Sequence, residues 1–286
     1  MLVLQQVAFA QSRVALKALV EYENNNYEGA IALIDSAVVS DGVEDPQAWH
    51  IRGFIYKDYY KNEDKKDFDA EIRKTAIASF YESNKLDSAG EFTERNKRVV
   101  NFISSTFQND AVQFLNKGDY NKAMEFYELF KEVKKENDPN FNFRDFDIEF
   151  TNGIATVMTA IYESNPDENE EYFDKAINKY KEVLEIDSLN FRANLNIGVM
   201  YYNLGVDKIK NIDPDEMDIF TLHELQDECI DLFRSALPYM KRAYEIDPKR
   251  REVVSGLSGI YFSLDDKEKF NHYSDLLEEL DGGEDE

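Results

Sequence analysis

Few residues in this sequence have the types and spacing that catalysis or metal binding requires. The three histidines, His50, His223 and His272, lie far apart, and His223-Glu224 lacks the second histidine that a helical zinc site needs. The single cysteine, Cys229, has no sequence cue for an activated thiol and fits a core position on a helix. The sequence also lacks a glycine-rich phosphate loop. We therefore expect no catalytic residue, no metal and no cofactor, and a protein that is not an enzyme.

Composition narrows the choice of partners. The 286 residues carry a net charge of −25, and that charge is spread along the chain. Such a surface repels nucleic acid phosphates and anionic lipid. No run of 18 apolar residues occurs, so no membrane insertion is expected. Nucleic acid is therefore not expected as a partner, and composition gives no oligomeric state.

The elements that would carry a binding surface are helices in a repeated pattern. Residues 172–205 form an uninterrupted stretch with apolar residues at helical spacing on both sides of Asp187-Ser188. This stretch predicts two amphipathic helices joined by a short turn. Its small anchor residue recurs along the chain, each time followed four residues later by a larger one, as Ala30, Ala76, Ala123, Ala176 and Ala236. A weaker copy of the pattern is Phe270 followed by Ser274. With only 6 Pro and 12 Gly, the chain is expected to be all-α.

These motifs resemble the tetratricopeptide repeat (TPR) family. The family pattern is Trp-x2-Leu-Gly-x2-Tyr, then Ala-x3-Phe, then Pro, over 34 residues. Its first half is matched by Trp49-x2-Arg52-Gly53-x2-Tyr56 and by Ile197-Gly198-x2-Tyr201. The resemblance implies a right-handed α-solenoid of helix hairpins, with about five repeats and a C-terminal capping hairpin over residues 11–280.

Spacing departs from the family. The anchor alanines are 46, 47, 53 and 60 residues apart, so we expect insertions or longer helices, chiefly at 57–73 and 206–228, whose roles stay open. Residues 88–103 and 134–150 are expected to connect repeats. The four phenylalanines of the second connector either fill a seam between repeats or form an exposed docking strip (Phe141, Phe143, Phe146 and Phe150). Thr221-x2-Glu224 predicts a capping box that opens a long helix. Residues 281–286 are expected to be a disordered acidic tail.

The first ten residues allow two interpretations. Ala8-Phe9-Ala10 before Gln11 is typical of a secretory cleavage site, so residues 1–10 are interpreted as the remnant of a signal peptide and the protein as periplasmic or secreted. The alternative is that they form the first turns of the first helix of a cytoplasmic protein.

The resemblance also implies where a partner would bind. In the TPR family, the first helix of each pair lines a concave surface that holds peptides. Mapped onto this chain, its exposed positions comprise ten candidate partner-binding residues: His50, Phe54, Lys57, Gln108, Asn109, Asn116, Arg192, Asn196, Tyr202 and Asn203, with Ile51, Val112 and Val199 between them. Their amides can hydrogen-bond an extended backbone.

Two functions follow from this surface. The first is a non-catalytic scaffold or adaptor that binds a partner protein or an extended peptide in an exported bacterial assembly. The second is a cytosolic co-chaperone that reads C-terminal peptides, because Arg192 and Asn196 resemble half of the family's carboxylate clamp.

Overall fold

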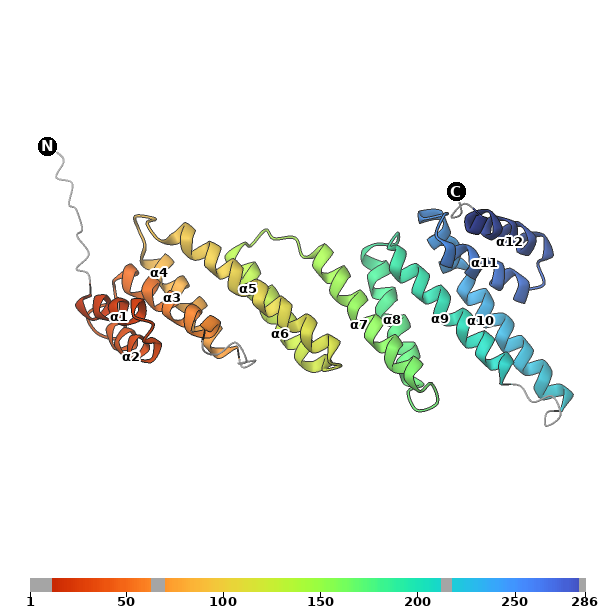
Figure 1. Cartoon of the computed structure of the whole chain (residues 1–286), viewed down its shortest axis with the longest axis horizontal. Coiled ribbons are helices and arrows are strands. Elements are labelled where there is room, and N and C mark those ends of the chain that lie inside the picture. The colour runs from red at the N-terminus through yellow and green to blue at the C-terminus, as the bar shows by residue number, and fades with distance from the viewer. Residues whose placement is uncertain (1–11, 63–69, 212–217, 283–286) are drawn as a thin grey trace. The chain divides into compact units, whose positions relative to one another are not determined.

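The computed structural model describes residues 12–62, 70–211 and 218–282, and these residues form twelve helices and no strand (Figure 1). The all-α prediction is confirmed. The chain divides into two compact units, unit 1 up to Phe141 and unit 2 from Asn142 onward. Unit 1 holds α1 (Arg13–Glu23), α2 (Tyr27–Ala37), α3 (Pro46–Asn62), α4 (Glu71–Leu86), α5 (Thr93–Asn116) and α6 (Tyr120–Asn137). Unit 2 holds α7 (Arg144–Ser164), α8 (Glu171–Ile186), α9 (Phe191–Lys210), α10 (Ile219–Ile246), α11 (Arg251–Ser263) and α12 (Lys267–Gly282).

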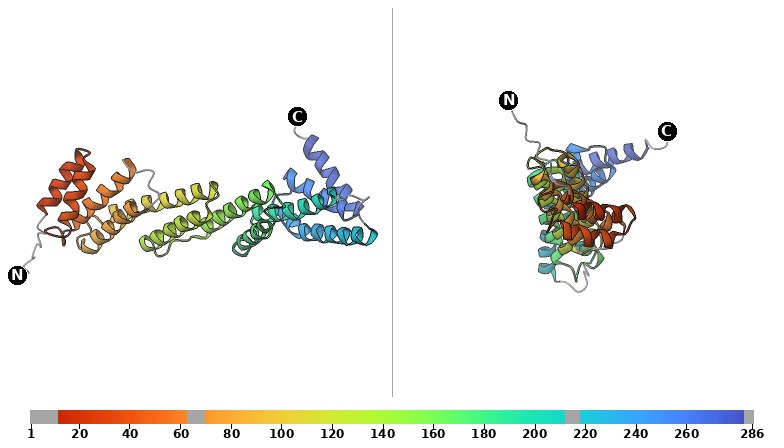
Figure 2. Two further views of the ribbon diagram at one scale, coloured as in Figure 1. Left: turned by 90° about the horizontal axis from the view of Figure 1, so that it is seen from below. Right: turned by 90° about the vertical axis from the view of Figure 1, so that its left-hand side faces the viewer.

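Within each unit, consecutive helices form hairpin pairs. The pairs of unit 1 are α1–α2, α3–α4 and α5–α6, and the second helix of each pair also contacts the first helix of the next. Unit 2 repeats this arrangement with α7–α8, α9–α10 and α11–α12. The views in Figures 1 and 2 agree on this order of neighbours within each unit. The first helices of neighbouring pairs also contact each other: α1 contacts α3, and α9 contacts α11. Packing between sequence neighbours in this way is compatible with a helical repeat protein.

The repeated sequence pattern marks the centre of each hairpin. The anchor alanines Ala30, Ala76, Ala123, Ala176 and Ala236 lie on α2, α4, α6, α8 and α10, and each is 0% exposed. In two hairpins, the larger residue four positions on packs against a glycine of the preceding helix. A Cβ on Gly53 would lie 2.5 Å from the Phe80 ring, and one on Gly198 would lie 3.1 Å from Met240 Cε. The glycine on the first helix leaves room for the larger residue on the second helix, so the two helices of the hairpin can pack closely.

The turns of three hairpins have the same conformation. In each, the second residue after the first helix has a positive φ, namely Asn25 (60°), Gly118 (78°) or Asp265 (56°). The backbone N–H groups of this residue and the next donate to the last turn of the helix, as in Asp265 N to Phe262 O (3.1 Å) and Asp266 N to Tyr261 O (3.0 Å). The next residue then caps the second helix, and Asp266 accepts from Lys269 N at 3.2 Å. One short segment thus ends one helix and begins the other.

Some predicted boundaries are wrong. Residues 88–103 are not a connector throughout, because α5 begins at Thr93, and α6 and α7 likewise extend into 134–150. The cap of α10 is Asp218, which accepts from the backbone N–H groups of Phe220 (2.9 Å) and Thr221 (3.1 Å), so Thr221 is not the capping residue. In α12, the helix extends to Gly282, two residues into the predicted acidic tail.

Other predictions lie outside the described residues. These are the signal peptide interpretation of residues 1–10, the central part of each insertion (63–69 and 212–217) and the end of the tail (283–286). Among the helices that the structure describes, none is both long and apolar enough to cross a membrane.

Tryptophan and cysteine each occur once in the chain, the tryptophan in unit 1 and the cysteine in unit 2. Trp49 lies on α3 in unit 1, where its Nε1 donates to the Val43 carbonyl at 3.0 Å. Cys229 lies on α10 in unit 2 and is buried, as the sequence predicted. Burial raises the pKa of its thiol, and Glu228 adds to this effect, so the group is an unreactive core side chain.

Candidate functional site

A pocket opens between the first helices of the three pairs in unit 1. Its volume is about 260 Å³. Its lining comes from α1, α3 and the start of α5: Leu19, Tyr22, Gln47, His50, Ile51, Phe54, Phe92 and Arg95. We call it the unit-1 pocket. Two predicted site residues, His50 and Phe54, lie in it, and Lys57 follows one helical turn after Phe54.

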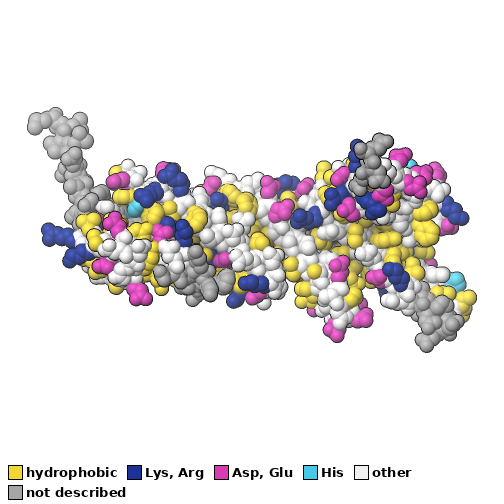
Figure 3. Space-filling model, viewed as in Figure 1, with side chains coloured by type: hydrophobic (Ala, Val, Ile, Leu, Met, Phe, Trp, Pro, Cys, Tyr) yellow, Lys and Arg dark blue, Asp and Glu magenta, His cyan; other side chains and the backbone are white. Residues whose placement is uncertain are grey.

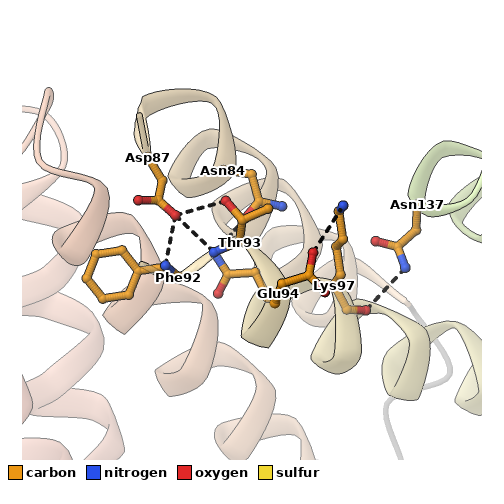
Figure 4. Close-up of polar contacts among 8 residues, drawn as sticks. Asn84, Asp87, Phe92, Thr93, Glu94, Lys97 and Asn137 are labelled. Atoms are coloured by element: carbon orange, nitrogen blue, oxygen red, sulfur yellow. Dashed lines mark hydrogen bonds and ion pairs between the residues drawn. The ribbon is translucent and has the colours of Figure 1, made fainter. Parts of the chain in front are cut away.

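The loop between α4 and α5 sets the position of Phe92. Asp87 accepts hydrogen bonds from the backbone N–H groups of Glu91 (2.9 Å), Phe92 (2.8 Å) and Thr93 (2.9 Å) and from the Thr93 hydroxyl (2.8 Å). Figure 4 shows the bonds to Phe92 and Thr93 and, further along α5, the Asn137 amide bound to the Lys97 carbonyl. Burial raises the pKa of Asp87, but the hydrogen bonds together outweigh it and hold that pKa below its usual value. An ionised Asp87 therefore organises the entry into α5.

His50 forms part of the pocket wall as a neutral side chain. It is 7% exposed, and its Nδ1 lies 2.6 Å from Asn96 Oδ1. The Asn96 amide nitrogen donates to Ser83 Oγ (3.0 Å) and Asn84 Oδ1 (2.8 Å), so its oxygen is the acceptor and His50 Nδ1 carries the proton. Burial lowers the pKa of His50 more than the bond to Asn96 raises it. The ring is thus held in one tautomer, with Nε2 as a hydrogen-bond acceptor.

Aromatic rings form the floor of the pocket. The His50 ring lies 4.7 Å from the Phe92 ring and 4.9 Å from the Phe54 ring, measured between centroids. Phe54 also packs edge-on against Phe80 of the core at 5.4 Å. The rings are therefore fixed from behind, and the pocket is preformed.

Arg95 supplies the one charged side chain of the lining. Its guanidinium lies 4.6 Å from the centre of the Phe54 ring. Lys57 lies 5.0 Å from the same ring, but it is paired with Asp58 at 2.7 Å. Asp58 in turn accepts from the Tyr22 hydroxyl at 2.5 Å, and burial together with this bond raises the Tyr22 pKa far above its usual value. The lining therefore combines apolar rings with one cation and includes no carboxylate.

Exposed apolar side chains also occur on two of the helices that line the pocket. On α1, Leu16 lies one helical turn before Leu19 and is 39% exposed, and Val20 follows Leu19 and is 54% exposed. On α5, Phe102 lies seven residues after Arg95 on the same helical face and is 53% exposed. The helices around the pocket thus carry further apolar surface that is open to solvent.

The remaining predicted residues of unit 1 do not reach the pocket. Gln108 is half-buried, and Asn109 and Asn116 are exposed, all on the later part of α5. At 1.5 Å per residue, Asn109 lies about 20 Å along the helix from Arg95. Val112, between them, is exposed. These side chains form no common site with His50 and Phe54.

The predicted residues of unit 2 are partly engaged within the fold. Asn196 donates to the Tyr180 hydroxyl at 2.7 Å, which links α9 to α8. Tyr202 is half-buried and packs against Phe233, with 5.7 Å between ring centroids. Arg192 is exposed and lies 3.6 Å from Glu149 on α7, and Asn203 is exposed. None of these four side chains lines the unit-2 clefts around Tyr261 and around Tyr162.

Sequence reasoning missed five of the eight residues that line the unit-1 pocket and misjudged the exposure of two others. Phe92 and Arg95 were assigned to a connector, and Leu19, Tyr22 and Gln47 were not considered. His50 and Ile51 were expected to be exposed, whereas both are buried. The sequence signal that could have revealed the start of α5 is Asp87 ahead of Thr93, because an aspartate can cap a helix from across a loop.

Comparisons with known proteins assign no family to this chain. No family model matches this chain, and no curated protein matches it closely enough to count as a relative. The hairpin packing within each unit is compatible with a helical repeat protein.

Proposed function

We propose that this protein is a non-catalytic TPR-like scaffold or adaptor, and that the unit-1 pocket holds one apolar side chain of a partner protein. The observation that supports this is the pocket itself, lined by packed aromatic rings, together with the exposed Leu16, Val20 and Phe102 on the helices that line it. Exposed apolar surface on the elements that form a cavity is characteristic of interaction sites.

The size of the pocket favours a side chain over a small-molecule ligand. Its volume of about 260 Å³ lies below the ~300–1,000 Å³ typical of small-molecule sites. Fully burying a Leu or Phe side chain contributes about 1.5–3 kcal/mol, and covering the exposed apolar residues of α1 and α5 would add further apolar area. Such a site therefore acts as the anchor of a longer peptide or protein contact.

The chemistry of the lining agrees with binding rather than catalysis. His50 is the ionisable imidazole of the pocket, but it is neutral and is held by Asn96 as part of the wall. The lining includes no nucleophile beside a base. We retain export as the proposed location, on the Ala8-Phe9-Ala10 pattern. The co-chaperone alternative gains no specific observation, because the Asn196 amide of its half clamp already binds Tyr180.

Site-specific crosslinking tests the proposal. A photoreactive phenylalanine analogue would replace Val20, the exposed residue next to Leu19 of the pocket lining, or, as the matched control, Val39, which is also an exposed valine of unit 1 but lies in the turn after α2. In cells of the source organism, we expect Val20 to crosslink a discrete partner that Val39 does not. Val20→Asp should then abolish capture of that partner, while Val39→Asp retains it. A partner captured equally from both positions, or retained by Val20→Asp, would contradict the assignment of the pocket.

A further inference from the structure

A second aromatic cleft lies at the turn between α11 and α12, in unit 2. Its volume is about 370 Å³. Its lining is Tyr261, Phe262, Asp265, Asp266, Lys267, Phe270 and Asn271. Phe262 is 69% exposed although it belongs to a helix that is otherwise well packed. Its ring lies 5.3 Å from that of Phe270, so two phenylalanines form one wall of the cleft.

The turn places a carboxylate next to these rings. Asp265 occupies the positive-φ position that Gly118 occupies in the α5–α6 hairpin, and its backbone N–H donates to the Phe262 carbonyl at 3.1 Å. Asp266 is already engaged, because it caps α12 and pairs with Lys269 at 2.7 Å. Asp265 meets only Lys267, at 4.0 Å, with both side chains more than 80% exposed. A pair this long and this exposed contributes almost nothing, so the Asp265 carboxylate is open to an incoming cation.

The surrounding charge favours the same kind of ligand. Residues 265–282 include seven acidic and two basic side chains. In Figure 3, Asp and Glu side chains gather over α12. This field attracts basic segments and opposes a second copy of a chain whose net charge is −25.

We propose that this cleft binds an arginine side chain, flanked by apolar residues, from a linear segment of a partner protein. The guanidinium would lie over the Phe262 and Phe270 rings and pair with Asp265, while the neighbouring apolar side chain covers the exposed face of Phe262. Arginine fits better than lysine because its planar, weakly hydrated group both stacks on aromatic rings and forms two parallel hydrogen bonds to a carboxylate. This inference is independent of the unit-1 pocket.

Titration of the whole protein with a defined peptide tests the inference. The probe is the blocked pentapeptide acetyl-Gly-Leu-Arg-Leu-Gly-amide, and the matched probe carries citrulline, an uncharged isostere, in place of arginine. Backbone amide shifts would be followed by two-dimensional NMR in 0.15 M salt, which screens the general charge of the protein. We expect saturable shifts confined to residues 261–271 and a dissociation constant about fivefold weaker for the citrulline peptide.

Matched variants separate this cleft from general attraction to an acidic protein. Asp265→Asn and Phe262→Ala should each weaken binding about fivefold. Glu279→Gln removes the same charge elsewhere on α12, and Phe220→Ala removes an exposed phenylalanine from α10, so both should leave the dissociation constant unchanged. Asparagine is tolerated at positive φ, and Phe262 is exposed, so both test variants should fold. Equal affinity for the two peptides, shifts spread over the acidic surface, equal loss in the controls, or no shift at millimolar peptide would each overturn the inference.

Discussion

Removing Asp110 should destabilise unit 1 more than removing its whole ion pair does. Arg73 on α4 is 0% exposed, and its Nη1 lies 2.6 Å from Asp110 Oδ2 on α5. Nη1 also donates to Thr106 Oγ1 at 3.0 Å, whereas Nε and Nη2 have no hydrogen-bond partner in the described structure. Asp110→Ala therefore leaves a buried cation without its counter-charge, which costs about 3–5 kcal/mol.

Replacing Arg73 as well should recover much of that loss. In the double variant Arg73→Met, Asp110→Ala, the apolar stem is kept and the two nitrogens without a partner, Nε and Nη2, are removed, each of which costs about 1–3 kcal/mol when buried. Against this gain stands the attraction of the guanidinium to the Phe107 ring at 4.4 Å and the Tyr60 ring at 4.6 Å, worth up to about 2 kcal/mol. We expect the double variant to be more stable than Asp110→Ala by about 2 kcal/mol.

Urea unfolding followed by Trp49 fluorescence measures these differences within unit 1. Trp49 lies on α3, which pairs with the helix that carries Arg73. Far-UV circular dichroism would show that each variant retains its helices before unfolding. The reasoning would be refuted by a double variant no more stable than Asp110→Ala, because the buried cation would then not be the source of the loss.

Three further perturbations test the packing and the loop. Asp87→Ala should lower the urea midpoint of unit 1 at pH 7 by the equivalent of about 1–2 kcal/mol. Because the folded pKa of Asp87 is depressed, this contribution is present above the unfolded value of about 3.9 and is lost as the pH falls through the folded value, so the wild type and the variant should converge in acid. A stability difference between the two that does not shrink as the pH is lowered from 7 into acid would show that the charge of Asp87 is not responsible. Gly53→Ala should cost about 1–3 kcal/mol despite its better helix propensity, because its Cβ meets the buried Phe80 ring, and adding Phe80→Leu should restore stability; no recovery in the double variant would point to another cause. In unit 2, Phe233→Ala should cost about 3–5 kcal/mol in thermal unfolding and Phe262→Ala less than about 0.5 kcal/mol, and similar losses would contradict the difference in their burial.

Much of the fold could be predicted from local pattern. The anchor alanines have a spacing typical of stacked hairpins, and all five occupy buried positions on second helices. Gly53 and Gly198 marked the close approach within two hairpins, because a glycine inside an amphipathic helix lowers its stability and is typical of a tight packing contact. These features are local, so the sequence alone reveals them. The division into two units at Phe141 has no such local signal.

The candidate site depended on contacts that local pattern does not reveal. His50 was predicted to be exposed from its place in the repeat, but Asn96 of a different hairpin binds it, 46 residues away. Tyr202 was assigned to a groove, whereas the lengthened α10 brings Phe233 against its ring. Arg95 was overlooked because the start of α5 was not predicted: Asp87 caps this helix from six residues before Thr93, and the residue next to the helix does not. In each case the prediction failed because the contacting side chain is not a close neighbour in the sequence.

The single tryptophan and the single cysteine give each unit its own native reporter. Emission from Trp49 changes only when its surroundings in unit 1 do, and a thiol reagent reaches Cys229 only when the core of unit 2 opens. Following both signals through one denaturant series therefore tells whether the halves lose their structure in a single concerted transition or one after the other, and it does so in the unaltered chain.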